Sequence, residues 1–221
     1  MADDTPAKPP VRTRNRRGEG GRLREEIVTA AVELLEEGGD ASAVTLRSVA
    51  RRVGIAAPSI YRHFPDQPAI MLAVVRSAFA ELDAELDAAV AAAGGGPRER
   101  LVALCQGYLE FAQARPGRYR SMFGGVWTPR PSDDGTASDA GSVTVRDMAE
   151  LGRPSMRRLA EALGACVEAG AASSTDVTAD AVALWLGLHG LAHQRMAAPS
   201  FEWPADIAER VIGSLAHLAE K

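Results

Sequence analysis

The chain has 221 residues, of which 46% are hydrophobic and 24% charged, a composition typical of a globular protein and unlike that of a fibre or a wholly disordered chain. Its formal net charge of −4 is unevenly distributed, because residues 1–65 hold 11 Lys and Arg against 9 Asp and Glu, whereas residues 66–221 hold 14 against 20. The net-positive part is therefore where a nucleic-acid contact is expected.

The cysteines and the apolar runs indicate the compartment. Cys105 and Cys166 lie inside apolar helical patterns, and no secretory leader is recognised. The longest apolar run, AVALWLGLHGLA at 181–192, is shorter than the roughly 20 residues that a membrane span needs. We expect a cytoplasmic protein without a membrane span, and no motif indicates a cofactor.

Six arginines are bunched in VRTRNRRGEGGRLR, residues 11–24. Such a cluster neutralises DNA phosphates in some proteins and is only a solvated tail in others, and both interpretations stay open. We expect residues 1–21 to form a disordered basic arm.

The next segment predicts two helices with clear ends. Apolar residues recur at helical spacing over residues 22–37, and the glycines of EGGD end this pattern. Thr45 is placed to cap a short second helix over LRSVARR, residues 46–52, and Gly54 permits a tight turn after it.

A third short helix follows that turn. Pro58 fits it only in the first turn, which places residues 59–64 on this helix. Two short helices joined by a glycine-containing turn indicate a helix-turn-helix, whose second helix enters the DNA major groove. Small residues at the tip and donor side chains beyond it would then face outward: Ala57, Pro58, Ser59, Tyr61, Arg62 and His63. The alternative is a helical hairpin in which Tyr61 and His63 are ordinary surface residues.

The stretch TLRSVARRVGIAAPSIYRHFPDQPAIMLAVV resembles the DNA-binding domain of the TetR (tetracycline-repressor) family, with the match covering about residues 22–76. The resemblance rests on the Thr that opens the second helix, an Ala-x-x-x-Gly before the turn and a Tyr-x-His-Phe that ends the third. It implies base contacts from Arg47, Ala57 and Pro58, and contacts to the DNA backbone from Thr45, Ser59, Tyr61 and His63. Two positions depart from the family pattern. Ala56 replaces a capping Ser or Thr. Gln67 replaces a Lys that often grips a phosphate, and it is counted among the candidate DNA contacts.

Residues 67–221 predict a second, wholly helical domain. A long helix is expected from about Gln67 to Ala93, another from Pro97, and a short helical turn in RPGRYRSMF. Residues 128–142, rich in Pro, Ser, Asp and Gly, predict a mobile loop, after which a helical pattern resumes with Met148, Leu151, Met156, Leu159 and Leu163. The fold class is therefore all-α, with the helix-turn-helix domain over residues 22–66.

The helix around ADAVALWLGLHGLAHQRM is apolar nearly all round. Val182, Trp185, His189 and Ala192 mark one predicted face, and Leu184, Leu188 and Leu191 mark another. With the last helix, which carries Ile207, Val211, Leu215 and Leu218, it would form a two-fold interface between two copies of the chain. The alternative is an ordinary central core helix.

FAQARPGRYRSMF and WLGLHG together resemble the TetR-like C-terminal domain with a Trp-x-x-x-His-Gly signature, matched by Trp185, His189 and Gly190. The resemblance implies a helical module that senses a small molecule. The candidate pocket residues are bulky apolar side chains mixed with a few polar ones: Tyr108, Phe111, Met122, Phe123, Trp127, Met148, Trp185 and His189. His189 and His193 lie four residues apart, but a packed and an exposed histidine are expected rather than a metal site.

No catalytic motif is present, so we expect no enzyme. The sequence is interpreted as a ligand-responsive homodimeric transcriptional repressor that binds a palindromic operator in double-stranded DNA. An activator or a co-repressor-dependent regulator of the same family is the first alternative. A helical interaction module without DNA binding is the second.

Overall fold

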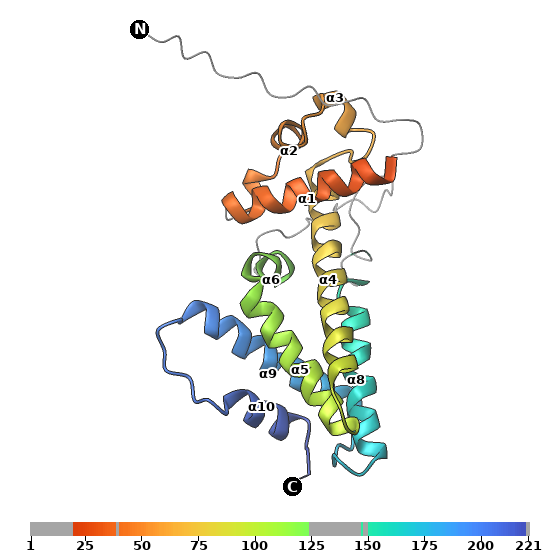
Figure 1. Cartoon of the computed structure of the whole chain (residues 1–221), viewed down its shortest axis with the longest axis vertical. Helices are drawn as coiled ribbons and strands as arrows, with labels where there is room; N and C mark the ends of the chain where they lie inside the picture. The colour runs from red at the N-terminus through yellow and green to blue at the C-terminus, as the bar shows by residue number, and fades with distance from the viewer. Residues whose placement is uncertain (1–19, 39, 124–146, 148–149, 220–221) are drawn as a thin grey trace, which may run out of the picture.

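The computed structural model describes residues 20–38, 40–123, 147 and 150–219. Its N-terminal part consists of α1 (Gly20–Gly38), the 3-10 turn η1 (Ala41–Ala43), α2 (Leu46–Val53) and α3 (Ala57–Ile60). Figure 1 shows these elements gathered at one end of the molecule, with α1 lying across α4. The predicted helix-turn-helix arrangement is confirmed.

Side chains at both ends of α2 explain its bounds. The hydroxyl of Thr45 accepts a hydrogen bond from the backbone N–H of Ser48 at 3.0 Å, and the Ser48 hydroxyl accepts one from the Thr45 N–H at 2.9 Å. This reciprocal pair satisfies N–H groups that the first helical turn leaves without partners. At the other end, Gly54 has a φ of 75°, a left-handed conformation that costs glycine little. The predicted cap and turn are both confirmed.

The third helix is shorter than predicted. It ends at Ile60, and residues 61–63 form a turn. The backbone N–H groups of His63 and Phe64 both donate to the carbonyl of Ile60, at 2.9 Å each, so this turn still packs Phe64 into the core. The helix stops because Phe64 precedes Pro65, and a residue before proline disfavours helical backbone.

The helix α4 (Gln67–Ala92) joins the two halves of the molecule. Asp66 caps it by accepting a hydrogen bond from the Ala69 N–H at 2.8 Å. Near its start it contributes Ile70, Met71 and Val74 to the N-terminal core. Near its end it contributes Leu82 and Leu86 to the C-terminal core. A shift of α4 therefore changes the packing of both cores at once.

The C-terminal part contains α5 (Pro97–Ala114), α6 (Pro116–Phe123), α8 (Arg153–Glu168), α9 (Val177–Ala197) and α10 (Ile207–Leu215). The described residues hold no named strand, only an isolated bridge between Ala172 and Leu218, and the all-α class is confirmed. The last helix is shorter than predicted, because it ends at Leu215 and leaves Leu218 to that bridge. Met148 and the predicted loop over residues 128–142 lie outside the described residues.

No helix in the described ranges is both long and apolar enough to cross a membrane. The two cysteines are free and buried. Burial raises the pKa of the Cys105 thiol to about 12, which keeps this sulfur protonated and unreactive.

The two predicted faces of α9 are covered to different extents within this chain. Leu184, Leu188 and Leu191 are buried in the core as expected. On the other predicted face, Val182 is 42% exposed, and Leu186 one turn further along is 56% exposed. Within the described chain, α9 thus packs on one side only, because its outward side meets no other helix.

The contact between α9 and α10 depends on Gly187. A Cβ atom at this position would overlap the side chain of Leu215 and lie 3.0 Å from a methyl group of Val211. The missing side chain lets the two helices approach closely. We expect the overpacked contact in Gly187→Ala to cost about 1–2 kcal/mol, which the helix propensity gained by alanine offsets in part.

The matched control for Gly187→Ala is Gly164→Ala in α8, where the new Cβ would meet Val177 at an ordinary 3.9 Å. That control gains helix propensity without a clash. Urea unfolding of the two variants measures the difference. Equal unfolding free energies would show that the glycine is not required for the helix contact.

Candidate nucleic-acid interface and effector cavity

The predicted DNA contacts lie on the outer surface of α2, α3 and the turn after α3. Arg47, Ala57, Pro58 and Arg62 are exposed, and the side chain of Tyr61 is 60% exposed. Figure 1 shows α2 and α3 at the end of the molecule farthest from α10. The structure brings these candidates to one end of the fold.

Three further polar candidates are less available to DNA. Thr45 is exposed, but its hydroxyl already bonds Ser48. Ser59 and His63 are half-buried, and His63 borders a hollow beside Arg24 of α1. The guanidinium of Arg24 lies over the ring of Phe64, 4.3 Å from its centroid.

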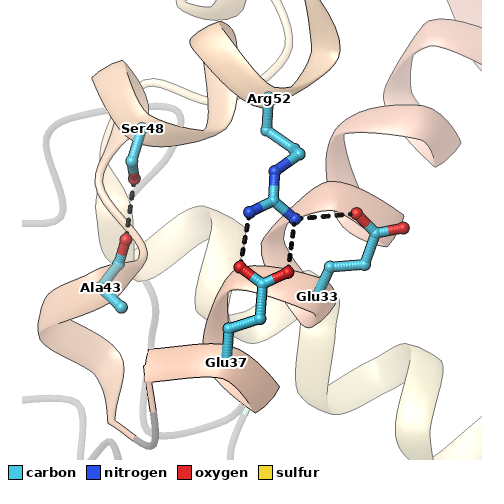
Figure 2. A network of polar contacts seen from close by, with 5 residues as sticks. All are labelled: Glu33, Glu37, Ala43, Ser48 and Arg52. Atoms are coloured by element: carbon cyan, nitrogen blue, oxygen red, sulfur yellow. Dashed lines mark hydrogen bonds and ion pairs between the residues drawn. The ribbon is translucent and has the colours of Figure 1, made fainter.

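The arginines near the predicted DNA surface include one that is structural and others that form no ion pair within the described residues. Arg52 donates to Glu37 at 2.6 Å and to Glu33 at 3.1 Å, both on α1 (Figure 2). The hydrogen bond from Arg52 lowers the pKa of Glu37, which stays ionised. By contrast, Arg47 and Arg62 make no ion pair within the described part of the chain, so their charges are available to phosphates.

Figure 2 also shows how the start of α2 is fixed, with the Ser48 hydroxyl donating to the carbonyl of Ala43 at 2.8 Å. Together with Arg52, this bond holds α2 against α1 and η1. The exposed side of α2 is thereby held in a defined orientation.

The two departures from the family pattern have structural counterparts. No side chain caps α3 at Ala56. The side-chain amide of Gln67 donates to the carbonyl of Ala41 at 2.7 Å, inside the domain. Gln67 thus links α4 to η1, and its predicted contact with DNA stays a prediction that this bond does not favour.

A cavity of about 480 Å³ lies in the C-terminal half, between α4, α5, α6, α8 and α9. It contains four of the candidate pocket residues, Tyr108, Met122, Phe123 and Trp185. Phe111 is fully buried in the core and is not among its lining residues. Trp127 and Met148 lie outside the described residues. The volume and the apolar walls of this cavity are those of a small-molecule site.

Several lining residues escaped the sequence prediction, chiefly Phe79, Leu82 and Leu86 of α4 and Arg153, Ser155 and Met156 of α8. The α4 residues recur at helical spacing, as core residues do, and periodicity cannot distinguish a core contact from a cavity wall. The aromatic rings meet beside the cavity, with Phe79 and Phe123 edge to face at 5.7 Å between centroids.

Behind the cavity, His189 joins two tyrosines. Its Nδ1 lies 2.7 Å from the hydroxyl of Tyr119 and 3.3 Å from that of Tyr108. The ring stacks on Trp185 at 5.3 Å between centroids. Burial raises the pKa of both tyrosines, so their hydroxyls stay protonated as donors. The packed His189 and the exposed His193 of the prediction are confirmed, and no group of three potential metal ligands occurs in the described residues.

The half-buried His189 predicts lower stability in acid. Burial, and secondarily the charge of His193, lower the pKa of His189 below its ordinary 6.5, so the unfolded chain takes up a proton that the folded chain resists. Stability is therefore full above about pH 6.5 and falls as the pH drops below it. We expect His189→Gln to flatten this fall between pH 7 and 5.5 in thermal unfolding. An unchanged pH profile would show that other groups cause it. His193→Gln, which removes only the secondary cause of the lowered pKa, is expected to flatten the fall less than His189→Gln does.

Comparisons with known proteins agree with this arrangement. Residues 27–74 match the family model of the bacterial regulatory proteins of the tetR family, and residues 101–218 match that of the tetracyclin repressor-like C-terminal domain. A solved protein of unknown function from Rhodococcus sp. RHA1 is 26% identical and superimposes with a TM-score of 0.73, covering 93% of this chain and 100% of that one.

Curated relatives match over shorter segments. The HTH-type transcriptional repressor KstR of Mycolicibacterium smegmatis is 36% identical over 78 residues, which cover 35% of this chain and 37% of that protein. The nucleoid occlusion factor SlmA of Vibrio vulnificus is 31% identical over 109 residues, covering 46% and 51%. The chain thus spans about half or less of the length of these relatives.

Proposed function

Because the chain belongs to the TetR family of DNA-binding transcriptional regulators, we propose that it acts in the cytoplasm as a homodimeric repressor, which binds a palindromic operator and is released by a small molecule. The DNA contacts are those of Arg47, Ala57, Pro58, Ser59 and Tyr61 on the exposed end of the helix-turn-helix. In two-fold symmetric pairs such surfaces read inverted repeats.

Dimer formation is supported by the outward side of α9. Val182 and Leu186 lie one turn apart and are both exposed, and Gly190, His193 and Ala197 continue the same exposed stripe. Glycine and alanine allow another helix to come close, and no Asp, Glu, Lys or Arg occurs at these five positions. Pairing the stripe with its symmetry mate removes apolar surface from water.

One observation supports a response to a ligand: α4 belongs both to the cavity wall and to the core of the DNA-binding domain. Phe79, Leu82 and Leu86 of this helix line the cavity, while Ile70 and Met71 anchor it in the DNA-binding domain. A ligand that fits the cavity better in one position of α4 shifts the equilibrium toward that position. The spacing between the two DNA-binding domains of a dimer then changes.

In vitro transcription from a promoter that overlaps the operator tests this proposal. The repressor is expected to lower the transcript level, and a cavity ligand is expected to restore it. A higher transcript level on adding the protein identifies an activator, and repression only in the presence of ligand identifies a co-repressor mechanism. Either result would contradict the proposed function.

A further inference from the structure

The effector cavity is chemically uneven. Most of its wall is aliphatic or aromatic, and Arg153 is the charged side chain among its described lining residues. Arg153 is the first residue of α8 and is exposed, so its guanidinium sits where the cavity meets solvent rather than deep among the rings. One end of the cavity is thus cationic and the rest is apolar.

The other polar groups near the cavity already have partners. The Tyr108 hydroxyl bonds Tyr119 and His189, and the Ser155 hydroxyl donates to Asp83 at 2.7 Å. Asp83 is in turn neutralised by Arg158 at 2.6 Å. None of these groups presents an unsatisfied charge to a ligand.

Arg153 differs from them, because no hydrogen bond or ion pair to it occurs within the described ranges. Arg158, on the same helix, is an arginine whose donors are already used. It forms ion pairs with Asp83 and Asp87 of α4 and thereby holds α8 against α4. Arg153 is left with its donors directed to solvent or to a ligand. A guanidinium pairs well with the oxygens of an anionic acid group, which can accept two parallel N–H donors.

We propose that the effector is an amphipathic acid, with an apolar body that fills the cavity and one acid group that pairs with Arg153. This inference rests on the proposed function, because it names the ligand class of the same cavity. A neutral molecule would leave the guanidinium unpaired, and a cation would be repelled by it. An acid group at the mouth keeps part of its hydration, while the apolar body leaves water.

Two fluorescent probes of nearly the same shape test the acid group. Both 8-anilinonaphthalene-1-sulfonate and N-phenyl-1-naphthylamine brighten in apolar sites, and only the first carries an acid group. The proposal expects saturable binding of both probes. It also expects that raising the salt concentration weakens binding of the sulfonate and leaves the neutral probe unaffected.

Substitution of the arginine gives the decisive comparison. Arg153→Gln is expected to lower the affinity for the sulfonate probe about tenfold and to leave the affinity for the neutral probe unchanged. Arg153→Lys keeps the positive charge and is expected to restore part of the lost affinity. Arg157→Gln is the matched control, because Arg157 is an exposed arginine one turn further along α8 and does not line the cavity. Circular dichroism confirms that each variant is folded.

The outcomes separate this inference from the proposed function. Suppose that the neutral probe binds, and that Arg153→Gln lowers the affinity for both probes equally or for neither. The cavity is then a ligand site, but the acid-specific proposal is wrong. If neither probe binds the folded wild-type protein, the ligand-responsive part of the proposed function fails as well.

Discussion

Leu186→Glu is expected to convert the protein to a monomer and to lower its affinity for an operator duplex about a hundredfold, the avidity lost when two half-sites are no longer held together. In a two-fold interface the substitution places two carboxylates near each other and removes two exposed apolar side chains from the contact. Analytical ultracentrifugation and fluorescence anisotropy with a labelled duplex measure the two effects.

Ala88→Glu is the matched control for Leu186→Glu, because Ala88 is exposed on α4, a helix outside the proposed interface. It adds the same charge and is expected to leave the mass and the affinity unchanged. A Leu186→Glu variant that stays dimeric would place the interface elsewhere and remove the role proposed for the exposed stripe of α9.

Arg47→Gln is expected to lower operator affinity by about 1–3 kcal/mol per half-site while leaving the stability of the domain unchanged. Arg47 is exposed on α2 and has no ion-pair partner within the described residues. Its charge is therefore available to DNA. Anisotropy titrations at several salt concentrations measure the affinity, and thermal unfolding measures the stability.

Arg52→Gln, on the same helix, is expected to give the opposite result. This arginine holds α2 to α1 through Glu33 and Glu37, so its loss lowers the midpoint of thermal unfolding. Well below that midpoint the variant is expected to bind DNA nearly as well as the wild type. If both substitutions impair DNA binding equally, the division between a structural and a DNA-facing arginine is wrong.

Local chemistry explains why the N-terminal domain was predictable. Thr45, Gly54 and Pro58 act through their own backbone or through the next turn, so their effects can be deduced from spacing alone. The error at the end of α3 is instructive. Phe64 keeps the expected buried position, but the backbone reaches it through a turn because of the proline that follows.

The C-terminal domain was less predictable, because an apolar residue has three possible places there: the core, a cavity wall or an open surface. Phe111 entered the core, Trp185 lines the cavity and Leu186 is exposed, although all three occur in similar helical patterns. Which place a side chain takes depends on how distant helices pack. The position of Arg153 at the cavity was unpredictable for the same reason, because residues of α4 and α6, distant in sequence, form the cavity beside it.

The central claim is that two copies of this chain read one inverted repeat. The most direct test is selection of bound sequences from a library of random duplexes at moderate salt, with the mass of the selected complex measured afterwards. We predict enrichment of one inverted repeat, with half-site centres about one helical turn or about 34–36 Å apart and two chains on each duplex. Enrichment of a single half-site bound by one chain, or no enrichment by a folded protein, would contradict it.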